Sequence, residues 1–190
     1  MTSVSRSHFR EITQERLEEF SHKGYKKRYF FPHRIYYVPK SGPDTLKLAH
    51  RMCGESEIAK QWEVLLYGTS PWLDEFPKEL FFDDDLIWHQ QQFGKTGHIA
   101  VAYLVVKERS LYGLNCVSDL VQRISRRREY KTRIEKKFDG WHHMLFNSIM
   151  NFAIENNVER IYSPTADLVR EHTDPSRTVQ RESFERIYER

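Results

Sequence analysis

Apolar and polar positions in the second half of the chain predict an antiparallel meander. Residues 98–106 form a strongly apolar run of strand length that follows a turn signal at 94–97. The run at 86–93 before this turn predicts the partner strand of a hairpin. A further turn at 110–113 and a third strand over 114–121 then continue the sheet.

The clearest helical pattern lies over residues 141–153. Its apolar and small residues recur at i, i+3 and i+4, which places them on one face of a helix: Trp141, Met144, Leu145, Ser148, Ile149, Phe152 and Ala153. Asp139 is suited to cap this helix, and a strand over 158–163 follows until Pro164 stops it. Strand, helix and strand in this order predict a β-α-β unit at 114–163 with its two strands parallel.

Signals in the first half of the chain are shorter. Aromatic and β-branched residues at 29–38 predict a strand. Asp44 is placed to cap a helix that runs through Met52 and ends at Gly54. Apolar positions at helical spacing predict a second helix over 57–67. We therefore expect one strand followed by two helices in this half of the chain.

These elements predict a mixed α/β fold in one domain. We expect a central, partly parallel sheet of about five or six strands with flanking helices. Residues 1–25 are polar apart from a short amphipathic run, so they predict a peripheral segment before a domain over 26–190. The length of 190 residues suits a single hydrophobic core.

Composition narrows the class of protein. Hydrophobic residues make up 39% and charged residues 30% of the chain, which is typical of a folded domain and not of a disordered one. No run approaches the roughly 18 to 20 apolar residues of a membrane span, and residues 1–10 lack the apolar centre of a secretory signal. Cys53 and Cys116 are far apart and show no zinc spacing. We therefore expect a cytoplasmic protein without a disulfide framework or a cysteine-based metal site.

Other possible metal ligands do not form a convincing set either. His142 and His143 are adjacent, and neighbouring positions of a helix point about 100° apart, so the pair is poorly arranged to hold one ion. The aspartates at 83–85 would alternate sides in an extended chain. No metal site is predicted.

Positive charge is concentrated in one segment. The net charge is only +3, but residues 123–137 hold many basic side chains against two acidic ones, Glu129 and Glu135: Arg123, Arg126, Arg127, Arg128, Lys131, Arg133, Lys136 and Lys137. The acids are spaced so that they could pair with bases along a helix, which favours a solvated surface. The same segment could bind nucleic acid or an acidic protein.

The junction between this basic segment and the helix after Asp139 predicts an anion site. A helix N-terminus presents backbone N–H groups and the positive end of the helix dipole, so it binds phosphate well. Gly140 would let the backbone approach a ligand closely. Together these features predict a site for a phosphorylated cofactor.

The order of elements around this junction resembles the GNAT superfamily of N-acetyltransferases. In that family a pyrophosphate-binding loop of the pattern Arg/Gln-x-x-Gly-x-Gly/Ala stands between a strand and a long helix, and a second strand and a tyrosine-bearing helix follow. The loop position is occupied here by Lys137, Phe138, Asp139, Gly140, Trp141 and His142. Lys137 stands where arginine or glutamine is usual, and His142 where glycine or alanine is usual. The resemblance spans roughly 85–190; two more strands normally follow, which a longer native chain or another element would supply.

The resemblance implies acyl transfer from acetyl-CoA or another acyl-CoA to a small-molecule amine by direct attack. Residues 137–142 would hold the phosphates, and Tyr188 would protonate the departing thiolate. The acceptor amine must be deprotonated before it attacks, and His89, Asp119 and Asp167 are candidate bases for that step. Ser163 and Thr165 follow the second parallel strand and are candidates for contact with the acceptor or the cofactor.

Two alternatives remain for the partner of the basic segment. Autoinducer synthases and N-acyl amino acid synthases share the fold and take their acyl group from acyl carrier protein, which is acidic and would suit the arginines at 126–128. The second alternative is a non-enzymatic module that binds nucleic acid or an acidic protein through residues 123–137. The patterns of RNA-recognition domains and zinc fingers are missing from the sequence, which makes nucleic acid the weaker of these partners.

Overall fold

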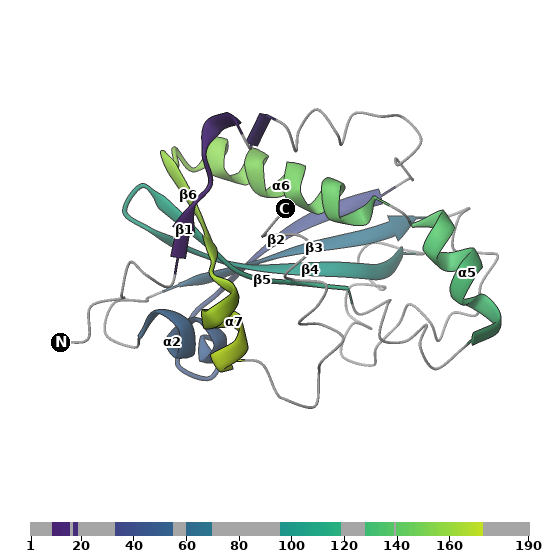
Figure 1. Cartoon of the computed structure of the whole chain (residues 1–190), viewed down its shortest axis with the longest axis horizontal. Coiled ribbons are helices and arrows are strands. Elements are labelled where there is room, and N and C mark those ends of the chain that lie inside the picture. Colours follow the sequence, from purple (N-terminus) through teal and green to yellow (C-terminus); the bar gives the residue numbers. More distant parts are fainter. Residues whose placement is uncertain are drawn as a thin grey trace.

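A six-stranded mixed sheet forms the centre of the protein (Figure 1). The computed structural model describes residues 9–15, 17–18, 33–54, 60–69, 96–118, 128–138 and 140–172. In this part of the chain the strand order is β1-β6-β5-β4-β3-β2. Neighbouring strands are antiparallel except β5 and β6, which are parallel. The expected mixed α/β class and the parallel pair of the β-α-β unit are therefore confirmed.

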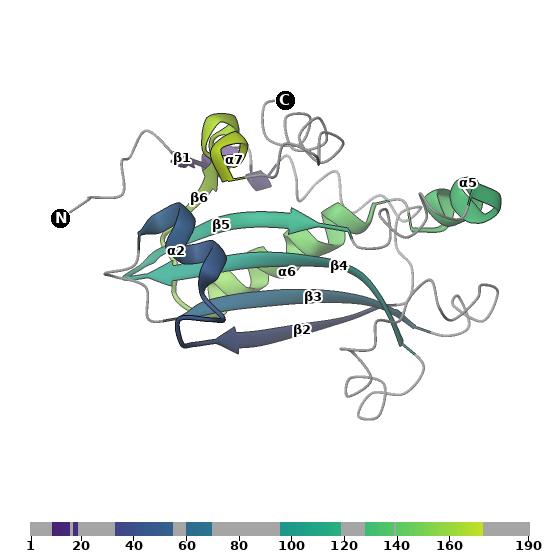
Figure 2. The same cartoon turned by 90° about the horizontal axis from the view of Figure 1, so that it is seen from below.

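The strands and helices have clear bounds. The strands are β1 (Phe9–Glu11), β2 (His33–Lys40), β3 (Gln61–Thr69), β4 (Thr96–Lys107), β5 (Ser110–Val117) and β6 (Arg160–Pro164). The helices are α2 (Lys47–Cys53), α5 (Arg128–Lys137), α6 (Trp141–Glu155) and α7 (Ala166–His172). Helix α6 lies across one face of the sheet, while α2 and α7 lie against the other (Figures 1 and 2). No helix in the described ranges is long and apolar enough to cross a membrane.

The apolar stripe of α6 builds the main core, as its spacing predicts. Its buried residues are Met144, Leu145, Ser148, Ile149, Phe152 and Ala153. The Phe152 ring stacks on Tyr37 of β2 and meets Trp62 of β3 edge to face, with centroids 5.4 and 5.0 Å away. The Tyr37 hydroxyl donates to the Ser148 carbonyl oxygen at 3.0 Å. Burial, and to a smaller extent Glu155, raises the pKa of Tyr37. Helix α6 is thus fixed against β2 and β3.

The helix expected at 57–67 is wrong, because residues 61–69 form strand β3. Val64 and Leu66 pack in the cluster beneath α6, whereas Leu65 and Tyr67 face the opposite side of the sheet. All four side chains are buried, so the segment carries a continuous apolar run instead of an alternating one. Such a short apolar run fits the period of a helix as well as that of a strand, and pairing with β2 and β4 decides for the strand.

The turn expected at 110–113 is also wrong, since these residues already belong to β5. The chain reverses at Glu108 and Arg109, between the paired residues Lys107 and Ser110. Glu108 adopts a left-handed backbone conformation with φ +54°. Glycine or asparagine usually marks that conformation, so the tight turn has no clear signal in the sequence. The strand expected at 98–106 is confirmed as β4, and its expected partner at 86–93 lies outside the described residues.

The basic segment is helical from residue 128 to its end. Helix α5 contains the last ten residues of this segment, 128–137. Ile134 is buried in the main core, whereas Lys131, Arg133 and Lys136 are exposed. Helix α6 then begins after Gly140, which caps it with φ +84° and no side-chain hydrogen bond. Asp139, which was expected to cap this helix, lies outside the described residues.

The N-terminal segment takes part in the sheet. Strand β1 pairs antiparallel with β6 and forms one edge of the sheet, and the Ile12 amide donates to the Ile161 carbonyl oxygen at 2.8 Å. Leu17 is buried in the main core. The residues expected to be peripheral thus supply the edge strand beside β6.

Truncation of Phe152 tests how much of the stability depends on the contact between α6 and the sheet. Phe152→Ala removes a buried ring and two aromatic contacts, so we expect it to lower the free energy of unfolding by about 3–5 kcal/mol. Ile154→Ala is the matched control, since Ile154 is 70% exposed on the same helix and should change stability by less than about 0.5 kcal/mol. Urea denaturation measures both, and equal losses would contradict the observed orientation of α6.

Candidate functional site

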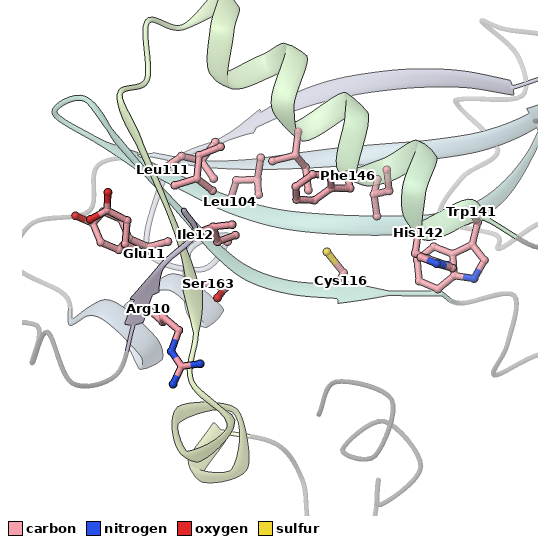
Figure 3. A pocket seen from close by; sticks show the side chains of 15 residues that line it. Arg10, Glu11, Ile12, Leu104, Leu111, Cys116, Trp141, His142, Phe146 and Ser163 are labelled. Carbon is pink, nitrogen blue, oxygen red and sulfur yellow. The ribbon is translucent and has the colours of Figure 1, made fainter. Parts of the chain in front are cut away.

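A pocket opens where the parallel strands β5 and β6 separate (Figure 3). The two strands pair at only three positions, which are Ser110–Arg160, Leu111–Ile161 and Tyr112–Tyr162. Beyond Tyr112, β5 continues along β4, while β6 continues along β1. The backbone of β5 therefore has no partner in β6 at the level of the pocket.

A β-bulge on β5 explains this divergence. The register between β4 and β5 shifts between Tyr103 and Leu104, whose partners are Asn115 and Gly113. Leu114 is the extra residue, and an extra residue bends its strand and increases the local twist. The bulge also resets which side chains face α6. Leu111, Gly113 and then Cys116 line the pocket, where strict alternation would have placed residue 115.

The walls of the pocket come from four strands and one helix. The pocket lies between α6 and the strands β1, β4, β5 and β6. Its volume is about 960 Å³ when the solvent at the open side of the pocket is counted. The lining residues are Arg10, Glu11, Ile12, Leu104, Leu111, Gly113, Cys116, Trp141, His142, Leu145, Phe146, Ile149, Ile161, Tyr162 and Ser163. Most of these side chains are apolar. The two charged ones, Arg10 and Glu11, lie on β1 and are exposed to solvent.

The helical period of α6 places five of its residues in the pocket wall. Trp141, His142, Leu145, Phe146 and Ile149 follow one another at spacings of one, three, one and three, so they lie on one side of the helix. Leu145 and Ile149 belong to the core stripe as well, whereas Trp141 and His142 stand at the first turn, at one end of the pocket (Figure 3). The rings of Trp141 and His142 meet edge to face with centroids 5.7 Å apart.

Part of the predicted phosphate loop is already hydrogen-bonded and packed within the fold. The Phe138 amide donates to the Ile134 carbonyl oxygen at 3.0 Å, and the Phe138 ring is buried in the core. The Trp141 amide donates to the Phe138 carbonyl oxygen at 3.2 Å. The amides of Phe138 and Trp141, both within the predicted loop at 137–142, therefore have backbone partners in this conformation. Lys137 is half-buried in the last turn of α5.

The structure brings together only some of the predicted site residues. Trp141 and His142 line the pocket together with Ser163, which is buried. Gly140 is buried at the N-terminus of α6. Asp167 is exposed in the first turn of α7 and is not part of the pocket wall. Thr165 accepts a hydrogen bond from the Leu168 amide at 3.4 Å and so serves the start of that helix.

Four predicted residues lie outside the described residues: His89, Asp119, Asp139 and Tyr188. The candidate general acid and two of the three candidate bases are among them. The chemistry expected of these side chains therefore stays a prediction. In the described part of the chain, no group of three or more metal-ligating side chains occurs.

Sequence reasoning missed the contribution of β1 and of the bulge. Arg10, Glu11 and Ile12 line the pocket because β1 pairs with β6, and a three-residue strand is too short to carry a periodic pattern. Gly113 and Cys116 reach the same face only through the extra residue between them. A glycine within a strand pattern is a signal for a bulge or a close approach, and Gly113 could have been recognised on that basis.

Selective alkylation of the two thiols tests which cysteine faces the pocket. Cys53 lies against the other face of the sheet, and burial raises the pKa of its thiol to about 12, although Lys107 partly offsets this. Only the thiolate reacts, so at pH 8 the reactive fraction of Cys53 should be roughly a thousandfold below that of an ordinary thiol. Cys116 is half-buried, and its sulfur points into the space beneath α6 (Figure 3).

We expect iodoacetamide to modify Cys116 first, as measured by mass spectrometry of peptides over time. Raising the pH toward 12 should accelerate the reaction of Cys53, because the thiolate forms as pH rises through its pKa. Cys53→Ser should leave the fast reaction unchanged, and Cys116→Ser should abolish it. Faster labelling of Cys53 at pH 8 would contradict the observed packing.

Comparison with protein-family models, with curated proteins and with solved structures found no match for this chain. No family assignment therefore follows from these comparisons, and the function has to be inferred from the fold and from the chemistry of the pocket.

Proposed function

We propose that the protein is an acyltransferase that moves an acyl group from a coenzyme A thioester to an amine. One observation carries the proposal: a largely apolar pocket lies at the point where two parallel strands separate, with the first turns of a helix as its wall. Ligands of open α/β sheets commonly bind beyond the carboxyl ends of the strands, and this pocket has that position on β5 and β6.

The separated strands suit a long, amide-bearing arm such as pantetheine. Backbone groups of β5 beyond Tyr112 have lost β6 as a partner, and exposed strand edges bind extended chains through main-chain hydrogen bonds. Pantetheine carries two amides along an extended chain and would occupy the place that β6 leaves. Its thioester would then stand near the bulge at Leu114, where the β5 ladder is locally interrupted.

The phosphates of the donor would lie at the N-terminal end of α6. Trp141 and His142 stand there at one end of the pocket, and the positive end of the helix dipole favours anions. Helix α5 ends next to this point and exposes Lys131, Arg133 and Lys136, with Lys137 half-buried in its last turn. These side chains would add positive charge around the same position.

The element order supports the same proposal. An antiparallel meander, a parallel β-α-β unit and a helix after the last strand occur in the order typical of the GNAT superfamily. The place beside β6, where that family continues its sheet with later strands, is occupied here by β1 from the N-terminal segment. We propose that this edge strand finishes the sheet next to the donor site.

In the proposed reaction the amine nitrogen of the acceptor attacks the thioester carbonyl carbon directly. The carbon–sulfur bond breaks, the amine loses a proton to a base, and the thiolate of coenzyme A takes up a proton from an acid. Backbone N–H groups near the bulge would stabilise the negative charge that develops on the carbonyl oxygen. Tyr188 stays the candidate acid, and His89, Asp119 and Asp167 stay candidate bases. An acidic acyl carrier protein is an alternative donor that would dock on the exposed bases of α5.

A titration with two variants of Cys116 tests the donor site. We expect acyl-CoA to bind to the wild-type protein with a heat signal in calorimetry. Cys116→Trp would fill the space between β5 and α6 and should weaken binding at least tenfold, or about 1.4 kcal/mol, while Cys116→Ser should change it by less than about threefold. Unweakened binding to the tryptophan variant would exclude this pocket. Absence of binding by both acyl-CoA and acyl carrier protein would refute the proposed function.

A basic binding module is the second candidate, and the exposed side of α5 is the observation that favours it. Lys131, Arg133 and Lys136 face solvent on a helix that is anchored by Ile134. Nucleic acid bound there should show an affinity that falls steeply with salt, and Lys131→Gln should reduce the slope by about one ion. A flat salt dependence of oligonucleotide binding would leave acyl transfer as the remaining candidate.

A further inference from the structure

The inner wall of the pocket offers no polar side chain. Leu104 of β4, Leu111 of β5 and Ile161 of β6 form it together with Leu145 and Ile149 of α6, and each is at most 7% exposed. A polar group placed among these side chains would lose its water without gaining a hydrogen bond from them. An aliphatic chain would gain free energy from the same transfer. This wall therefore favours binding of an aliphatic chain over binding of a polar group.

The length of this wall exceeds that of an acetyl group. On α6 this wall runs from Leu145 to Ile149, which corresponds to roughly 6 Å at the rise of an α-helix. A single methyl group would leave most of this length unfilled, and cavities lined by leucine and isoleucine stay dry. A chain of several methylenes would fill it.

Gly113 provides the third line of evidence, since neither its backbone nor its neighbours require glycine. The glycines with positive φ in the described residues are Gly42, Gly54 and Gly140, so Gly113 has a conformation that other residues adopt. A Cβ at Gly113 would come within 4 Å of one atom, the Tyr162 carbonyl oxygen, at an ordinary 3.6 Å. Besides the adjacent bulge, room in the pocket is a reason for a residue without a side chain in the middle of β5.

We infer that the inner part of the pocket holds a medium-length aliphatic acyl chain, so that the group transferred is a fatty acyl group and not acetyl. This inference rests on the proposed acyl transfer for its chemistry. The thioester would lie near the bulge on β5, and the chain would extend beneath α6 between Leu111, Leu145 and Ile149. Gly113 would set the width of the passage.

The test is a calorimetric series of acetyl-, hexanoyl-, decanoyl- and palmitoyl-CoA on the wild-type protein and two variants of Gly113. We expect wild-type affinity to rise by roughly fourfold for each methylene that the pocket can bury, and to level off once it is filled. Gly113→Leu should abolish this rise, so that the long-chain donors lose more affinity than acetyl-CoA does. Gly113→Ala, the matched control, should retain most of it because its Cβ makes only an ordinary contact.

A second variant changes the pocket in the opposite direction and guards against misfolding of Gly113→Leu. Phe146 is half-buried in the pocket wall, and Phe146→Ala should move the preference toward palmitoyl-CoA. Near-ultraviolet circular dichroism checks that each variant is folded. Equal affinity for acetyl- and decanoyl-CoA in the wild-type protein, or equal weakening of all donors by Gly113→Leu, would overturn the inference.

A parallel titration with decanoate separates this inference from the proposed function. Decanoate that binds and is excluded by Gly113→Leu would support the chain site even if no thioester bound, and acyl transfer alone would then be refuted. Thioesters that bind with no dependence on chain length would support acyl transfer and refute the chain site. Absence of binding by every ligand would refute both.

Discussion

The parallel ladder between β5 and β6 is only three residue pairs long, and the pocket exists because of where that ladder stops. Each of the two strands is held on its other side, β5 by β4 and β6 by β1, so both persist after they separate. The bulge at Leu114 provides the bend that sends β5 away from β6. A gap in the middle of a sheet would normally leave buried backbone groups without partners, and a ligand with amides of its own is one way to satisfy them.

Helix α6 joins this gap to the rest of the molecule. Its Phe152 end is anchored against β2 and β3 through Tyr37 and Trp62, while its Trp141 end forms a wall of the pocket. Leu145 and Ile149 belong to the core and to the pocket at once. The proposed ligand would therefore contact side chains that also form the core, and its binding should stabilise the fold by mass action.

The exposed basic side chains of α5 are separated from the apolar pocket beneath α6, both in sequence and in space. The exposed bases of α5 precede the first turn of α6, and Ile134 and Phe138 anchor the junction in the core. An anionic group held at this junction would keep its contact with solvent, while any attached apolar part extended beneath α6. The acidic and basic residues of β1, Glu11 and Arg10, stay exposed at the wall formed by that strand. This arrangement suits an amphiphilic ligand more than a wholly polar one.

The sequence by itself determined the elements that have a long, regular pattern. Periodicity and element order predicted the apolar stripe of α6, the apolar run of β4 and the parallel β-α-β unit. Trp141 and His142, two residues of the predicted phosphate loop, line the pocket, and the binding role predicted for them stays a prediction. Only the tertiary structure decided the rest. β3 became a strand because β2 and β4 cover its two edges, and its short apolar run fits a helix equally well. β1 and Cys116 reach the pocket through pairing with β6 and through one extra residue at Leu114, and such long-range contacts leave no local pattern in the chain.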